Sequence, residues 1–167
     1  MDLGIQGKSA TICASSRGLG KGCATALASE GVNVLINGRN QETLDKTAEE
    51  IIKKSKVDVK VVCADITTSE GQNKLLDKCS DPDILVNNAG IVKRGLEYRI
   101  EHFADVINTN LMGVMRMSHD ALPKLALTHG NIINIASMFS FFGSPMSPGY
   151  TASKTGLVGL TKSLANG

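Results

Sequence analysis

Near its N-terminus the chain reads Ala10-Thr11-Ile12-Cys13-Ala14-Ser15-Ser16-Arg17-Gly18-Leu19-Gly20. The first five of these residues are mostly apolar and predict a buried strand. From Gly18 onward the periodicity is that of an amphipathic helix, with Ala24, Leu27 and Ala28 on one face. Glycines at 18 and 20 permit tight backbone geometry between the two elements. The stretch therefore predicts a strand, a glycine turn and a helix in immediate succession.

The same alternation of strand and helix continues along the chain. Apolar, β-rich runs predict strands at 10–14, 32–36, 57–63, 84–86 and 132–135. Helical periodicity predicts helices at 18–30, 41–55, 69–79, 103–127 and about 149–165. Strands that are apolar almost throughout are typical of parallel sheets covered on both faces. The order predicts an α/β fold with a doubly wound parallel sheet, and we expect residues 1–167 to form a single domain.

Composition favours a globular protein with small-molecule partners. Of the 167 residues, 42% are hydrophobic and 20% are charged, and the net charge is only +2. Such a small net charge argues against nucleic-acid or membrane partners, and the lack of a long apolar run predicts a cytoplasmic protein. The four cysteines form no C-x-x-C pair, so we expect reduced thiols. The three histidines lack the spacing of a zinc site, so no metal is expected.

The glycine turn is a candidate site for a pyrophosphate. Free N–H groups at a helix N-terminus attract an anion, although glycines alone are equally compatible with an ordinary strand-to-helix turn. The second predicted strand ends at Asn37-Gly38-Arg39-Asn40, where an acidic residue would bind a ribose 2′-hydroxyl. Arg39, with Arg17 from the glycine turn, would instead neutralise a 2′-phosphate, which favours NADP(H) over NAD(H). A solvated surface charge is the alternative for each arginine.

Five sequence features occur in a characteristic order. They are Ala14-x-x-x-Gly18-x-Gly20, Asn87-Asn88-Ala89-Gly90, Asn110, Ser137 and Tyr150-x-x-x-Lys154. Together they resemble the classical short-chain dehydrogenase/reductase family, and the 3-oxoacyl-thioester reductases within it. The resemblance covers almost the whole chain and implies a Rossmann-type sheet of five strands in the order 3-2-1-4-5. It also implies hydride transfer between NADP(H) and a carbonyl or alcohol.

Tyr150 and Lys154 stand four residues apart, so on a helix they project from the same face. An ammonium beside a tyrosine stabilises the phenolate and so brings the pKa of the tyrosine closer to working pH, where it can exchange a proton. By resemblance, Lys154 also holds the nicotinamide ribose, Ser137 hydrogen-bonds the substrate oxygen, and Asn110 holds a water that relays protons to Lys154. Taken separately, these residues could be a surface pair, a strand-end serine and a helix asparagine bonded to backbone.

The resemblance also implies a set of cofactor-binding residues. They are Ala14, Ser16, Arg17, Gly18, Leu19, Gly20, Arg39, Asp65, Ile66, Asn88, Ala89, Gly90, Tyr150 and Lys154. In this set Asp65 lies beside the adenine, although it could equally cap the next helix.

The segment between Ser137 and Tyr150 holds three of the four phenylalanines, at positions 139, 141 and 142. Loops seldom concentrate aromatic residues in this way. They could wall an apolar part of the substrate pocket, or they could serve packing or a subunit contact.

Two of the chain's departures from the family bear on the candidate site. Ala14 stands where the family usually has the first glycine of its fingerprint, and alanine is tolerable there if the backbone keeps φ below zero. The family's later strands and substrate-covering loop are absent, so the chain is either a fragment or a short protein completed by another chain. The last helix then lacks part of its cover, which favours a homo-oligomer.

Two other functions remain open. One is a non-catalytic NADP(H)-binding sensor or assembly protein, for which the catalytic set would be unnecessary. The other is an S-adenosylmethionine methyltransferase, which would be expected to carry an acidic residue in place of Arg39.

Overall fold

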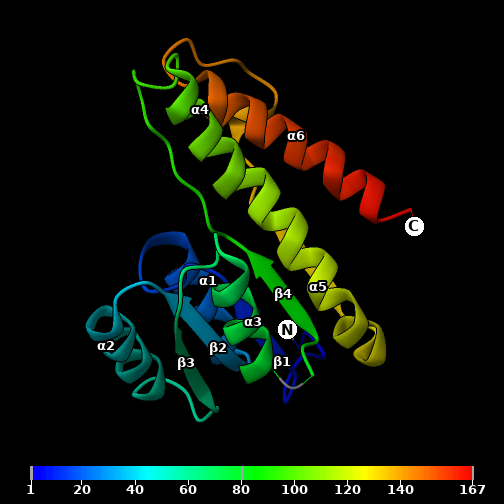
Figure 1. Ribbon diagram of the computed structural model, residues 1–167. Helices are drawn as coiled ribbons and strands as arrows, with labels where there is room; N and C mark the ends of the chain where they lie inside the picture. The colour runs from blue at the N-terminus through cyan, green and yellow to red at the C-terminus, as the bar shows by residue number, and fades with distance from the viewer. Residues whose placement is uncertain (1, 80, 167) are drawn as a thin grey trace. The chain divides into compact units, whose positions relative to one another are not determined.

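The computed structural model describes residues 2–79 and 81–166, and its core is one parallel sheet. Its strands are β1 (Ser9–Ile12), β2 (Asn33–Gly38), β3 (Val59–Cys63), β4 (Ile84–Asn87) and β5 (Asn131–Asn134). They lie in the order β3-β2-β1-β4-β5, and Figure 1 shows the first four of these strands side by side. The pairs β1–β2, β1–β4 and β2–β3 are parallel. The predicted fold class and strand order are confirmed.

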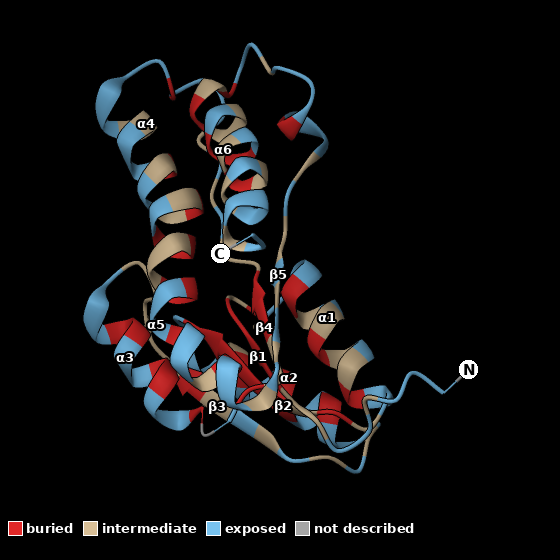
Figure 2. Cartoon of the chain, turned by 90° about the vertical axis from the view of Figure 1, so that its right-hand side faces the viewer, coloured by how far each residue is buried: buried red, intermediate tan, exposed pale blue. Residues whose placement is uncertain are grey.

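The strands form where the apolar runs fall, because both faces of the sheet are covered. All but the first residue of β1, β2 and β4 are buried, as Figure 2 shows in red. Helix α1 (Gly18–Ser29) packs on β1 and β2, α2 (Gln41–Ile52) packs on β2 and β3, and α3 (Ser69–Lys78) packs on β3. This arrangement brings the carboxyl ends of β1, β2 and β3 to one edge of the sheet.

The predicted helix at 103–127 is longer and less regular than expected. It comprises α4 (Ile100–Ile107), a π-helical turn η1 (Asn108–Met112) and α5 (Gly113–Thr128). A short 3₁₀ turn η2 (Met138–Ser140) precedes α6 (Pro148–Leu164), which was predicted within one residue at each end. π-turns inside helices frequently mark functional sites.

The chain divides into two compact units. The sheet unit is Met1–Asn88 with Ser118–Ile133, and the helical unit is Ala89–Met117 with Asn134–Gly167. Within the helical unit, α6 lies beside α4 (Figure 1) and also contacts η1 and η2.

Several properties of the described residues bear on the function. Over residues 2–79 and 81–166, no helix has both the length and the apolar character needed to cross a membrane. No group of three His, Cys, Asp or Glu side chains in those same ranges could hold a metal ion. All the cysteines are free thiols; Cys13 and Cys79 are buried, and Cys23 and Cys63 are half-buried.

Candidate functional site

The glycine turn after β1 is held by side chains from two neighbouring strands. Ala14 has a φ of +50°, so the negative φ under which alanine would be tolerated without strain is not met. Its N–H donates to Oδ1 of Asn37 at 3.2 Å, and its carbonyl accepts from Nδ2 of Asn88 at 3.0 Å. The side chain of Asn37 also donates to the carbonyls of Val62 and Ala64, at 3.1 Å each. These long-range bonds impose the left-handed conformation on an alanine.

Gly20 lies where a side chain cannot fit. A Cβ at this position would stand 2.5 Å from the Ala14 carbonyl oxygen and 2.5 Å from Nδ2 of Asn88. Gly18 has a φ of +59°, which glycine adopts freely. Arg17 and Leu19 are exposed beside them, and Ser16 is half-buried, with its carbonyl accepting from Oγ1 of Thr47 at 2.8 Å. A bare, close-packed turn at a helix N-terminus suits a dinucleotide pyrophosphate.

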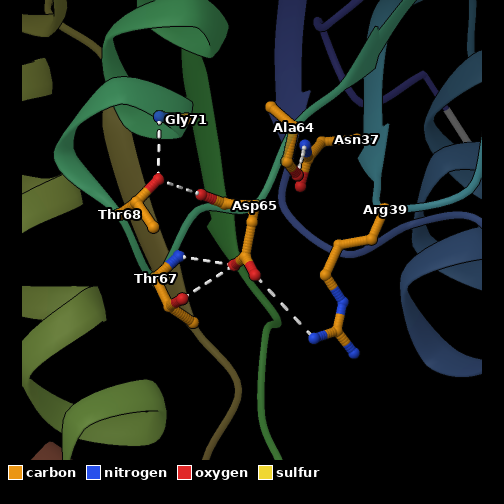
Figure 3. Close-up of polar contacts among 7 residues, drawn as sticks. All are labelled: Asn37, Arg39, Ala64, Asp65, Thr67, Thr68 and Gly71. Atoms are coloured by element: carbon orange, nitrogen blue, oxygen red, sulfur yellow. Dashed lines mark hydrogen bonds and ion pairs between the residues drawn. The ribbon is translucent and has the colours of Figure 1, made fainter.

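Arg39 and Asp65 follow the ends of β2 and β3 and face each other (Figure 3). Nη1 of Arg39 lies 3.9 Å from Oδ2 of Asp65; the arginine side chain is largely exposed and the aspartate side chain partly so. The other oxygen of Asp65 accepts from the N–H and hydroxyl of Thr67, at 2.9 and 2.8 Å. Partial burial opposes ionisation of Asp65, but these hydrogen bonds and Arg39 outweigh it and lower its pKa.

The cap of α3 is Thr68 rather than Asp65. Oγ1 of Thr68 accepts from the Gly71 N–H at 3.1 Å, as Figure 3 shows. The carbonyl of Ile66 accepts from Nε2 of Gln72 at 2.8 Å, which fixes the turn after β3. The Asp65 carboxylate is therefore not required for the helix cap and remains directed toward Arg39.

In the helical unit, Asn110 ties the segment after β4 to α6. It lies in the π-turn with no exposed surface. Its Oδ1 accepts from the Ile91 N–H at 2.8 Å, and its Nδ2 donates to the Ile91 carbonyl and to Oγ of Ser153, at 2.9 and 3.1 Å. The side-chain amide is thus engaged on both of its polar atoms.

Tyr150 and Lys154 lie on the same face of α6, as their spacing requires. The Lys154 Nζ lies 5.8 Å from the centroid of the Tyr150 ring and donates to the Ile135 carbonyl at 2.5 Å. Only 4% of Lys154 is exposed, and this burial lowers its pKa. A Cβ on Gly90 would lie 3.7 Å from Lys154 Nζ and 3.5 Å from Asn110 Oδ1, so these three residues meet.

Ser137 begins the turn that packs on α6. Its Oγ accepts from the Phe139 N–H at 3.2 Å, which leaves its hydroxyl proton for an acceptor outside this turn. The Phe139 ring packs edge-on against Tyr150 with centroids 6.2 Å apart, and Oγ of Ser140 donates to the Lys154 carbonyl at 2.9 Å. The turn and the helix are therefore coupled through Phe139 and Ser140.

The predicted residues separate by unit. The proposed catalytic residues, with Ala89 and Gly90, all lie in the helical unit, whereas the cofactor residues from 14 to 66 and Asn88 lie in the sheet unit. Sequence reasoning missed Asn37, Ser140 and Ser153, whose roles depend on partners far along the chain. Their polar side chains next to apolar runs were the only signal.

Comparison with known proteins decides the family. Residues 8–167 match the model for the short chain dehydrogenase family. The chain belongs to that family. It is 36% identical to a 3-oxoacyl-[acyl-carrier-protein] reductase of Aquifex aeolicus, an alignment that covers 99% of this chain and 69% of the relative. The predicted family is confirmed, and with it the oxidoreductase class.

Other members act on different molecules. The chain is 37% identical to the 2-dehydro-3-deoxy-D-gluconate 5-dehydrogenase of Escherichia coli, covering 97% of this chain and 66% of the relative. L-sorbose reductase of Gluconobacter frateurii, solved with NADPH and L-sorbose, superposes with a TM-score of 0.95 at 30% identity, covering 99% of this chain and 66% of that one. The chain thus spans about two thirds of the length of these proteins.

Proposed function

We propose that this chain carries the site of an NADP(H)-dependent oxidoreductase that interconverts a carbonyl and an alcohol. The observation that carries the proposal is the Tyr150/Lys154 pair, with the lysine buried and its Nζ 5.8 Å from the tyrosine ring. The nicotinamide, when bound, supplies or accepts the hydride.

Tyr150 acts as the acid in reduction and as the base in oxidation. In reduction its phenol gives a proton to the oxygen of the carbonyl, and the Lys154 ammonium stabilises the phenolate that remains. The Ser137 hydroxyl donates a hydrogen bond to the same oxygen as charge develops on it. Burial lowers the pKa of Lys154, so its proton is less tightly held than that of an exposed lysine. Asn110 would hold the water through which Lys154 recovers a proton.

The turn after β1 fits a dinucleotide, because a Cβ at Gly20 would fill the space against Ala14 and Asn88. Ala14, Ser16, Gly18, Leu19 and Gly20 would hold the pyrophosphate side. Arg39 and Arg17 are exposed and would neutralise a 2′-phosphate, which makes NADP(H) the preferred cofactor.

The other proposed cofactor residues would contact the adenine and the nicotinamide ribose or shape the cleft. Asp65 and Ile66 would lie at the adenine, and Asn88, Ala89 and Gly90 would shape the cleft. Tyr150 and Lys154 would bind the nicotinamide ribose.

Arg39→Asp tests the choice of cofactor. It should raise the dissociation constant for NADPH and leave that for NADH little changed, as measured by titrating the reduced cofactor's fluorescence. Exposed Lys46→Ala on α2 provides a control for general surface charge. An unchanged NADPH/NADH ratio in Arg39→Asp would remove Arg39 from the proposal.

A 3-oxoacyl thioester is the proposed substrate class. The 36% identity with a 3-oxoacyl reductase supports it, as does the absence of any charged residue from 131 to 149. A sugar-acid or ketose substrate is the second candidate, favoured by the 37% identity with the gluconate-derivative dehydrogenase.

The decisive assay follows NADPH consumption with purified protein against acyl thioesters, ketoses and keto acids. Tyr150→Phe should lower turnover by about 10²-fold or more and leave NADPH affinity nearly unchanged. Retained turnover would contradict the role of Tyr150. Tight NADPH binding without any turnover would favour the alternative function, a non-catalytic NADP(H)-binding sensor or assembly protein.

We also propose self-association in a cytoplasmic setting. Val158, Leu160 and Leu164 of α6 are only half-buried, which leaves apolar surface for a second copy. The free thiols fit a reducing compartment. Sedimentation equilibrium at micromolar concentration tests the association, and a monomer mass would contradict it.

A further inference from the structure

Glu97 is a buried acidic residue in the segment between β4 and α4. Only 1% of it is exposed, although neighbouring Leu96 and Tyr98 are 47% and 73% exposed. A carboxylate is rarely so buried unless partners replace its water. Glu97 belongs to none of the family motifs identified in the sequence.

Both carboxylate oxygens of Glu97 accept backbone hydrogen bonds. Oε1 accepts from the Lys93 N–H at 2.8 Å, and Oε2 accepts from the Tyr150 N–H at 2.7 Å. Short N–H···O bonds to a charged oxygen are among the stronger hydrogen bonds in proteins. Glu97 therefore joins its own segment directly to the residue proposed as the acid.

Glu97 takes the place of a local cap for α6. The N-cap residue Ser147 makes no side-chain cap bond, and Pro148 at the first helical position has no N–H. The first turn of a helix leaves N–H groups unpaired, and a carboxylate there also complements the helix dipole. Glu97 supplies that acceptor from a different element.

The first turn of α6 leaves space for the Glu97 carboxylate. A Cβ on Gly149 would lie 3.2 Å from Oε2 of Glu97, so glycine at this position leaves the carboxylate room. Two further bonds join the same segments: Gly95 N–H to the Met146 carbonyl at 2.7 Å, and the Tyr98 hydroxyl to the Pro145 carbonyl at 3.0 Å. These hydrogen bonds join the segment before α4 to the start of α6, and Glu97 is the buried residue among their partners.

We propose that Glu97 is a positioning residue that fixes the first turn of α6 and thereby aims the Tyr150 phenol. The catalytic consequence rests on the proposed function. A displacement of about 1 Å in a reacting group can lower a rate on the order of 10²-fold. Glu97 holds the backbone nitrogen of Tyr150, so its loss moves the ring without removing any group that reacts.

The test compares Glu97→Gln with Glu101→Gln. Glutamine keeps the size of glutamate but turns an NH₂ group toward one of the two backbone N–H donors, so one bond is lost. Glu101 lies four residues further on, exposed in the first turn of α4, and serves as the matched control.

The first readout does not depend on activity. Hydrogen exchange of whichever of the Lys93 and Tyr150 amides loses its acceptor should accelerate by about tenfold or more in Glu97→Gln, while exchange in α1 stays unchanged. The chain has two tyrosines, so ¹³C-labelled tyrosine gives two ring signals, which Tyr98→Phe assigns. The Tyr150 signal should shift in Glu97→Gln and remain in place in Glu101→Gln.

The second readout is kcat per NADPH-binding site, which corrects for unfolded protein. It should fall by about 10–100-fold in Glu97→Gln, with the KM for NADPH within about twofold of the parent value. Unchanged exchange and ring signals, or altered signals with unchanged kcat, would overturn the positioning role. If the parent chain shows no turnover, the proposed function fails, and the exchange and ring signals alone decide whether Glu97 positions Tyr150.

Discussion

Replacing Ala14 with glycine should stabilise the protein. Ala14 has a φ of +50°, in the left-handed region that disfavours any residue with a Cβ. Its N–H and carbonyl are both bonded to side chains, at 3.2 Å to Asn37 and 3.0 Å to Asn88, so the backbone cannot relax. Glycine can keep both bonds and adopt the same φ without strain.

The size of the effect follows from two opposing terms. The left-handed conformation costs a residue with a Cβ roughly 1–2 kcal/mol. Glycine gives the unfolded chain more freedom, which offsets about 0.4–1 kcal/mol of that gain. The net increase in the free energy of unfolding is about 0.8 kcal/mol, within a range of roughly 0–1.6 kcal/mol. For a chain of this length the melting temperature should rise by about 1–4 °C.

Urea denaturation followed by circular dichroism measures the change. His129 has a φ of +52°, so His129→Gly should give an increase of similar size far from the glycine turn. Ala126 is exposed within α5, and Ala126→Gly should instead lower the free energy of unfolding by about 0.5–1 kcal/mol. A loss of stability in Ala14→Gly, equal to that in Ala126→Gly, would refute the assignment of strain to Ala14.

Three further perturbations have definite expected outcomes. In Gly20→Ala the new Cβ would stand 2.5 Å from the Ala14 carbonyl oxygen, so the free energy of unfolding should fall by about 1–3 kcal/mol. The same substitution should weaken NADPH binding in a fluorescence titration. An unchanged affinity would contradict a close approach of the cofactor to Gly20. Burial lowers the pKa of Lys154 in the folded state, so the unfolded state binds the proton more readily. The free energy of unfolding should therefore rise between the lowered pKa and that of a free lysine, about 10.4, by at most about 1.4 kcal/mol per pH unit. Denaturation across that range should lose this slope in Lys154→Met, and a persisting slope would assign it elsewhere. Replacing the exposed Phe141 and Phe142 with alanine should raise KM for bulky apolar substrates and leave stability within about 0.5 kcal/mol, whereas equal effects on all substrates would argue against a pocket wall.

The sheet could be predicted because its signals are local. Each strand is a short apolar run beside a turn, and the structure has a strand at all five predicted positions. The edge strand β3 begins at Val59 rather than at 57, because pairing with β2 begins there. Local pattern thus determines which segments form strands, and pairing determines where they end.

The π-turn at Asn108–Met112 could not be predicted in this way. The apolar face of the helix continues through it, so periodicity alone indicates an uninterrupted helix. Asn110 is bonded to Ile91 and Ser153, which are 19 and 43 residues away. The spacing of Tyr150 and Lys154 was informative for the opposite reason, since four residues on one helix fix their common face without help from the rest of the chain.

Three departures from local rules lie among the residues proposed for function, whereas the left-handed His129 lies outside them. Ala14 is left-handed, Lys154 is a buried cation, and Glu97 is a buried carboxylate. Each arrangement costs free energy by itself, and each is held by bonds from distant segments, as Asn37 and Asn88 hold Ala14. The strain at Ala14 and the burial of Lys154 therefore agree with the proposed site, because both arrangements depend on contacts with distant segments rather than on local sequence.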